Sequence, residues 1–194
     1  MDKDLFGEKV IKKKKRTLLE TSLAKYDRDT FDTRLARLKY LDKIFPKNYS
    51  IVGDMQTVFV FGEAKMTFIN GEFISTILLA QAFIEKKLQG HYIDLGLNNI
   101  ASRGLKAIIR HARRHCVLHD YLLDRIDDLR KKRNPFSHIK PVDYEYNLDK
   151  RFMTDQKTSG KQQDPSDILE QDAKEALSLM YTVFISDLRT IKNE

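Results

Sequence analysis

The chain has 194 residues, a formal net charge of +7 at pH 7 and 41% hydrophobic residues. This hydrophobic content is too high for a disordered chain, and eight Gly and four Pro are too few for a collagen-like or linker-dominated protein. The single cysteine, Cys116, excludes a disulfide framework and a zinc site built from several thiolates. The length fits one compact domain of about 100–150 residues plus an extension.

The positive charge is concentrated in two parts of the chain. Residues 101–140 contain 11 basic and 4 acidic residues, residues 1–50 are also basic, and residues 141–194 are acidic. Basic regions of this kind are typical of proteins that bind nucleic acids or other polyanions, because each neutralised phosphate releases counterions. The alternative is that these charges only solvate the outer faces of helices.

Membrane and secretory segments are not expected. The longest uncharged run near the middle, Phe73–Ile84, is shorter than the about 20 residues that a membrane-spanning helix needs, so it predicts a buried helix. The N-terminal sequence MDKDLFGEKVIKKKKR begins with acidic residues and lacks the apolar core of a signal peptide. We therefore expect no membrane partner and a cytoplasmic location.

The first fifty residues predict a basic helical extension. Val10–Tyr26, which includes the basic run Lys12–Arg16, is expected to be helical. Thr30–Ile44 has apolar residues three and four positions apart, the spacing of an amphipathic helix, and Pro46 should end it.

The next segment, Met55–Ile69, fits two patterns. Its β-branched and aromatic residues favour a strand, whereas the spacing of its apolar residues also fits a helix. The turn Asn70-Gly71-Glu72 and the helical pattern of Phe73–Gln89 decide between them, because two helices joined by a short turn form an antiparallel hairpin. We predict a first helix capped by Asp54 and a second helix that ends at Gly90.

The second half of the chain predicts three more helices. One follows Asn98-Asn99 and has a basic face, and another covers Leu118–Arg133. The polar stretch Lys140–Ser166 predicts a mobile loop. The last helix is expected to be capped by Asp164-Pro165 or Ser166.

These elements together predict an all-α protein. Residues 54–194 are expected to form an antiparallel bundle of four to five helices. Residues 1–50 form an N-terminal helical extension, and residues 140–166 form a flexible loop within the bundle domain.

The segment Arg133-Asn134-Pro135-Phe136-Ser137-His138 carries the strongest chemical signal. Arginine binds phosphate with a bidentate fork, and histidine transfers protons near neutral pH. Five positions apart on a straight helix, Arg133 and His138 would point about 140° away from each other. Because Pro135 disfavours the helical conformation at Asn134, we expect the helix to stop or kink there and the two side chains to converge on one cleft.

In that arrangement Asn134 would cap a new helical turn, and its free N–H groups would add an anion site. The alternative interpretation is that His138 is a structural hydrogen-bonding group at a helix end.

This segment resembles the hallmark of the HEPN superfamily, the higher-eukaryote and prokaryote nucleotide-binding helical domains. The hallmark is an Arg, a polar residue, a few further positions and a His, after an amphipathic helix near the end of a four- or five-helix bundle. Arg133, Asn134 and His138 occupy these places, and the lead-in Leu129–Asn134 is similar to that of the family.

The predicted helical hairpin extends the resemblance. Glu63–Phe73, continued through Ala80–Leu88, is similar to the helix pair that opens many domains of this family. The resemblance covers about residues 54–191 and leaves out the first fifty residues. It implies the HEPN-like bundle fold.

The resemblance implies a metal-independent endoribonuclease that needs no cofactor, of the kind found among toxins and antiviral-defence effectors. His138 would act as general acid or base at the ribose 2′-hydroxyl or the leaving 5′-oxygen. Arg133 would stabilise the charge that develops on the phosphorane, and Asn134 would orient the histidine or the phosphate. The products would be a 2′,3′-cyclic phosphate and a 5′-hydroxyl.

The resemblance also implies partners. Family members commonly form homodimers in which two such motifs face one cleft, so we expect a homodimer, with RNA contacted by Arg130, Lys131 and Lys132. Glu85 lies where relatives often carry an acidic residue and is the candidate for a supporting role. An antitoxin or regulatory protein is a further expected partner. The alternative function is a non-catalytic HEPN-like module that binds RNA, a nucleotide or a protein partner.

Other reactive residues favour structural roles. His111 and His115 have the i, i+4 spacing of a zinc site, but the arginines around them would repel a cation, so we expect no metal. Cys116 is expected to be buried. The adjacent Asp127 and Asp128 point to different sides of a helix, and we expect one of them to pair with the basic run that follows.

Overall fold

The computed structural model describes residues 17–45, 51, 54–159 and 164–190, and these form α-helices and no strand. In chain order the helices are α1 (Leu18–Ile44), α2 (Met55–Asn70), α3 (Phe73–Asp94), α4 (Asn98–Ala101), α5 (Leu105–Arg114), α6 (Asp120–Ser137), α7 (Leu148–Ser159) and α8 (Pro165–Ile185). The predicted all-α class is confirmed for this part of the chain.

The chain divides into two compact units, Met1–Ala36 and Arg37–Glu194. The boundary falls inside α1, earlier than the predicted boundary near residue 50. The reason is that Leu41 and Phe45 are buried in the core of the second unit. Of the predicted first helix, the part before residue 17 lies outside the described residues, and the remainder belongs to α1.

The hairpin of α2 and α3 forms as predicted. The Asp54 carboxylate accepts a hydrogen bond from the Thr57 N–H at 2.7 Å and caps α2. Gly71 ends α2 in the left-handed conformation, with φ +84°, which costs glycine little. The Gly71 and Glu72 N–H groups then bond the Phe68 and Thr67 carbonyls at 3.0 and 2.8 Å.

The predicted end of the second helix at Gly90 is wrong. α3 continues through Gly90 to Asp94, and its last turns bury Leu88 and Tyr92 completely. The apolar surface buried on both sides of Gly90 outweighs the about 1 kcal/mol that a glycine costs inside a helix.

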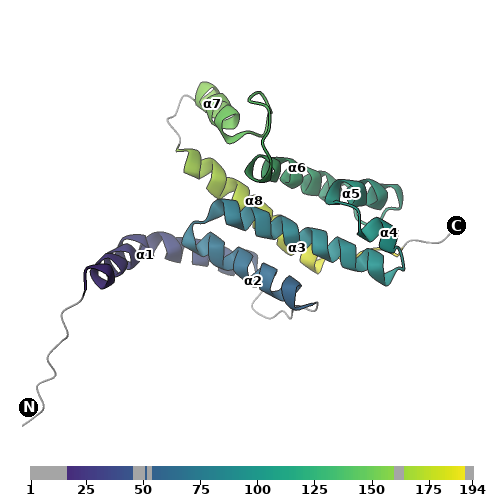
Figure 1. The fold of residues 1–194 in the computed structure, drawn as a ribbon, viewed down its shortest axis with the longest axis horizontal. Helices are drawn as coiled ribbons and strands as arrows, with labels where there is room; N and C mark the ends of the chain where they lie inside the picture. Colours follow the sequence, from purple (N-terminus) through teal and green to yellow (C-terminus); the bar gives the residue numbers. More distant parts are fainter. Residues whose placement is uncertain (1–16, 46–50, 52–53, 160–163, 191–194) are drawn as a thin grey trace, which may run out of the picture. The chain divides into compact units, whose positions relative to one another are not determined.

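α3 is the central helix of the second unit. It packs against α2, α4, α5, α6 and α8, and Figure 1 shows α2 along one side of it and α6 along the other. The rings of Phe61, Phe83 and Phe184 meet in this core at centroid distances of 5.0–6.2 Å. The helices thus form a bundle around α3, as the apolar periodicity predicts.

The predicted helix after Asn98 is broken into two. α4 ends at Ala101, and α5 begins at Leu105, after the extended residue Gly104. The break gives α5 its own N-terminus beside α3. The N-cap residue Gly104 has no side chain, and the Glu85 side chain on α3 accepts the hydrogen bond from the Leu105 N–H instead, at 3.2 Å.

Of the predicted stop or kink at Asn134, the stop is wrong, because α6 runs through Pro135 to Ser137. Proline has no N–H to donate to the Lys131 carbonyl one turn earlier. The Tyr144 hydroxyl takes this place and donates to the Lys131 carbonyl at 3.4 Å. Asn134 therefore lies inside the helix and does not cap a new turn, so the anion site predicted there does not form.

A further helix lies within the predicted loop 140–166. α7 is polar and lacks a strong apolar stripe, so periodicity does not reveal it. Arg151 on α7 holds it to α8 by two hydrogen bonds to Asp172, at 2.6 and 2.8 Å. At the start of α8 the predicted cap at Asp164 is confirmed, where the Asp164 side chain accepts from the Ser166 N–H at 2.8 Å.

Asp172 is only 2% exposed and also lies 3.4 Å from the Lys132 ammonium on α6. We predict that Asp172→Ala lowers the free energy of unfolding by about 3 kcal/mol, since it leaves partly buried cations of α6 and α7 without their shared anion. Chemical denaturation measures this loss. Asp128→Ala removes a more exposed partner of Lys132, at 3.2 Å, and should cost less than about 1 kcal/mol. Equal losses in the two variants would contradict the buried role of Asp172.

Candidate functional site

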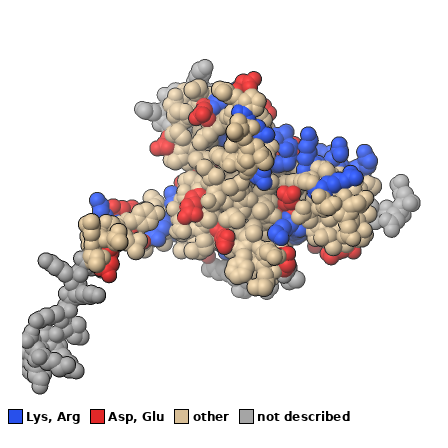
Figure 2. Space-filling view, viewed as in Figure 1, with Lys and Arg blue, Asp and Glu red and all other residues tan. Residues whose placement is uncertain are grey.

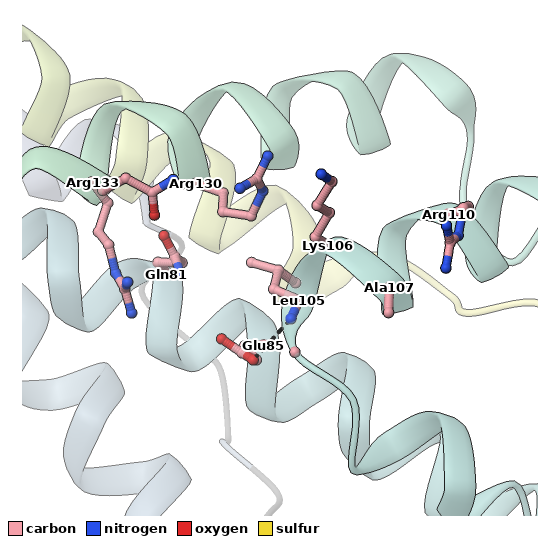
Figure 3. Close-up of a pocket in the computed structure, with 10 residues that line it drawn as sticks. Gln81, Glu85, Leu105, Lys106, Ala107, Arg110, Arg130 and Arg133 are labelled. Atoms are coloured by element: carbon pink, nitrogen blue, oxygen red, sulfur yellow. Dashed lines mark hydrogen bonds between the residues drawn. The ribbon is translucent and has the colours of Figure 1, made fainter. Parts of the chain in front are cut away.

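A pocket of about 580 Å³ lies between α3, the start of α5 and α6 (Figure 3). Its wall is polar and rich in cations. The lining residues are Gln81, Glu85, Gly104, Leu105, Lys106, Ala107, Arg110, Arg130, Arg133 and Asn134.

Helical spacing explains why these residues meet. Gln81 and Glu85 are four positions apart on α3, and Arg130 and Asn134 are four apart on α6, so each pair shares one face of its helix. Arg133, the residue before Asn134 on α6, also lines the pocket (Figure 3). The pocket therefore combines one face of α3 with one face of α6.

The start of α5 makes the third wall. The first N–H groups of a helix have no partner within it and carry the positive end of the helix dipole. Glu85 satisfies the first of them, at Leu105. Lys106 and Arg110 on α5 add two full positive charges to the pocket wall. The electrostatics favour an anion.

Arg133 is one of four cations that line this pocket, with Lys106, Arg110 and Arg130. Its side chain is partly buried, and within the described residues its Nε has no hydrogen-bond partner and no carboxylate pairs with it. Arg130, in contrast, bonds Asp127 at 2.7 Å. A buried Nε–H without a hydrogen-bond partner costs free energy, so its position beside an open pocket fits a binding site for an anion.

A second unsatisfied group lines the same pocket. Gln81 is 2% exposed, and its Oε1 has no hydrogen-bond partner in the described part of the chain. Figure 3 shows the Gln81 side chain beside that of Arg133. Gln81 and Arg133 thus line one pocket, and each has a buried polar atom without a hydrogen-bond partner among the described residues.

His138 lies outside this pocket. It directly follows α6 in an extended conformation, and its N–H donates to the Asn134 carbonyl at 2.9 Å. Its side chain is exposed and does not belong to the pocket wall. Of the predicted site residues, the pocket brings together Glu85, Arg130, Arg133 and Asn134, and leaves His138 at the end of the helix.

Lys131 and Lys132 point away from the pocket. Lys131 pairs with Asp127 at 3.0 Å and lies over the Tyr146 ring. Lys132 turns toward α8 and bonds Glu175 at 2.8 Å. Burial alone lowers the pKa of Lys132, but the hydrogen bond that Lys132 donates to Glu175 and the nearby carboxylates outweigh burial and raise the pKa. The predicted pairing of Asp127 and Asp128 with the basic run is confirmed.

Sequence reasoning did not single out Gln81, Lys106 or Arg110. Gln81 is a polar residue inside the apolar run Phe73–Ile84, one turn before Glu85. Lys106 and Arg110 repeat at i, i+4 on α5. These sequence features do not indicate a site by themselves, because only the structure shows which helix faces meet at the pocket.

The histidines of α5 form a different structure. The rings of His111 and His115 stack at 4.3 Å, and the Tyr92 hydroxyl lies 3.1 Å from His111 Nδ1. Burial, and then the charges of His115 and nearby arginines, lower the pKa of His111, while burial raises the pKa of Tyr92 to about 12. No cluster of three metal-ligating side chains occurs among the described residues.

Cys116 is exposed, with φ +52°, so the prediction of a buried cysteine is wrong.

The surroundings of the pocket are basic as well. Figure 2 shows Lys and Arg side chains gathered over the part of the bundle that α5 and α6 form. This is the part of the chain in which the basic residues are concentrated. Such a surface attracts polyanions toward the pocket.

Comparison of the chain with protein-family models, curated proteins and solved structures finds no match. Within the described ranges, every helix is too short or too polar to cross a lipid bilayer.

We predict that Arg133→Met leaves the free energy of unfolding unchanged or raises it by up to about 1 kcal/mol, because it removes an unsatisfied buried donor. Tripolyphosphate at ten times its Kd should raise the Tm of the wild type by about 3–5 °C and leave the variant unchanged. Arg130→Met, which removes a cation already paired with Asp127, is the matched control and should retain most of this response. A loss of more than about 2 kcal/mol in Arg133→Met would instead assign Arg133 a structural role.

Proposed function

We propose that this protein is a metal-independent endoribonuclease, in which the Arg133 pocket holds an RNA phosphate and His138 transfers protons. The observation that carries the proposal is the partly buried guanidinium of Arg133, which has no carboxylate partner in the described part of the chain and lines a basic pocket with Asn134. The resemblance of Arg133, Asn134 and His138 to the HEPN hallmark supports the same assignment.

In the proposed reaction the ribose 2′-oxygen attacks the phosphorus while the bond to the 5′-oxygen breaks. One proton leaves the 2′-hydroxyl and one is added to the 5′-oxygen, and His138 is the group that exchanges them. Arg133 stabilises the charge that builds on the phosphorane, and Asn134 orients the phosphate. The products are a 2′,3′-cyclic phosphate and a 5′-hydroxyl, and no metal or other cofactor takes part.

The position of His138 bears on the assembly. Because His138 does not line the pocket of its own chain, one chain alone leaves the acid–base group apart from the phosphate site. We propose a homodimer that brings the C-terminal ends of two α6 helices to one cleft, so that each site combines the pocket of one chain with the histidine of the other. Control by an antitoxin or regulatory protein, in a toxin or antiviral-defence setting, belongs to the same proposal.

The alternative function is a non-catalytic module that binds RNA, a nucleotide or a protein partner. The exposed position of His138 outside the pocket favours it, since the pocket can hold a phosphate without the histidine. The two functions share the phosphate site and differ only in whether a bond is cut.

The test of cleavage uses total RNA in EDTA. We expect the wild type to produce fragments with cyclic-phosphate and 5′-hydroxyl ends, and His138→Ala and Arg133→Ala each to slow cleavage at least about 100-fold. Arg114→Ala, which removes an exposed charge of α5 away from this pocket, is the matched control and should change the rate less than about threefold. Cleavage by the wild type no faster than by the two site variants, with RNA still bound, would support the alternative.

The composite site has its own test. Mixing His138→Ala and Arg133→Ala proteins under conditions that exchange subunits should restore about one quarter of the wild-type activity, because half of the dimers then contain one intact site. A site built within one chain predicts no recovery. Sedimentation shows whether the mixed dimers form, and a stable monomer at micromolar concentration would contradict the composite site.

A further inference from the structure

The second unsatisfied group of the pocket, the Gln81 amide, has no role in the reaction described above. Three polar or charged residues of the described chain are buried, namely Thr76, Gln81 and Asp172. Thr76 bonds the Glu72 carbonyl and the Thr67 hydroxyl, both at 3.0 Å, and Asp172 bonds Arg151. Gln81 differs from both because its Oε1 has no partner among the described residues.

This exception has a cost. A buried acceptor without a hydrogen bond destabilises a protein by about 1–3 kcal/mol, and an apolar side chain would suit the interior of α3 better. The same residue lines the open pocket with Arg133, so a bound molecule supplies the missing hydrogen bond once the buried Gln81 amide turns toward it. The required group is a donor that lies close to the anion held by Arg133.

A phosphate group itself does not meet this requirement. Its charged oxygens only accept hydrogen bonds, so they satisfy Arg133 and leave the Gln81 oxygen unpaired. In RNA, the carbon next to the one that bears the 3′-phosphate carries the 2′-hydroxyl, which both donates and accepts. DNA lacks this group. Because a hydroxyl is donor and acceptor, it pairs with either end of an amide.

We propose that Gln81 binds the ribose 2′-hydroxyl next to the phosphate held by Arg133, so that this pocket distinguishes RNA from nucleic acids without that hydroxyl. Gln81 is then a specificity-determining residue. The inference rests on the proposed function for its ligand class, since it takes the pocket to hold an RNA phosphate. It does not depend on cleavage.

The experiment measures binding without cleavage, in a His138→Ala background. The probes are a short single-stranded RNA and the same sequence with 2′-fluoro sugars, which keep a small group at the 2′ position but cannot donate. Gln81-containing protein should bind the RNA roughly tenfold more tightly than the fluoro analogue. Gln81→Met should bind the two equally, at the affinity of the fluoro analogue. Equal binding by the Gln81-containing protein, or full discrimination by Gln81→Met, would overturn the proposal.

A second variant guards against a change in folding. Gln81→Glu places a carboxylate beside Arg133, supplies the missing counter-ion and should weaken both ligands at least tenfold, while the Tm of the free protein stays equal or rises. Unchanged affinity for both ligands would place Gln81 away from the anion and overturn the proposal.

The outcomes separate this inference from the nuclease assignment. Discrimination by Gln81 with no cleavage of total RNA removes the nuclease proposal and leaves the inference intact. Cleavage that needs Arg133 and His138, with equal binding of the two probes, removes the inference about Gln81 and leaves the nuclease proposal intact.

Discussion

The burial of α3 is the constraint on which the rest of this structure depends. Helices pack against it on several sides, so most of its side chains must be apolar, and its residues cannot shift without disturbing the whole core. Gln81 and Glu85 interrupt this apolar surface one turn apart. Their positions are therefore fixed by the packing of the core, and the floor of the pocket that they form is rigid.

Glu85 links this floor to the basic wall. By accepting the Leu105 N–H it stabilises the start of α5, the helix that carries Lys106 and Arg110. It also places a negative charge in a pocket that is otherwise positive. A carboxylate in that place limits the repulsion among the cations when no anion is bound.

A run of four basic residues on α6 does not make one basic patch. Consecutive residues of a helix point about 100° apart, so each meets different neighbours. Arg130 and Lys131 meet Asp127, and Lys132 meets the carboxylates of α8. Arg133 is left facing the pocket. The net charge of the segment thus overstates how many of its side chains are available to bind phosphate. The partners of each side chain show which ones are available.

Local patterns predicted most of the helices, because apolar periodicity and caps such as Asp54 and Asp164 act within a few residues. The errors have a common cause. In each case the local structure depends on a partner that the local pattern does not include. The helix continues past Gly90 because of the core around Tyr92, it continues past Pro135 where the Tyr144 hydroxyl bonds it, and α7 is held by Asp172. Within the site, Arg133 and Asn134 belong to a recognisable motif, whereas a glutamine in an apolar helix resembles any tolerated core residue until its missing hydrogen bond is seen.

Pro135 illustrates how such a distant partner changes the meaning of a motif. The proline was expected to stop or kink α6, so that Arg133 and His138 converge on one cleft. α6 continues through the proline, which leaves the Lys131 carbonyl without an N–H donor one turn later. The Tyr144 hydroxyl bonds that carbonyl and ties the chain after His138 to the side of α6. His138 is held between the end of the helix and this attachment, with its ring exposed. His138 is thus exposed at the end of α6 and separate from the pocket wall of its own chain, which is the arrangement that the proposed composite site requires.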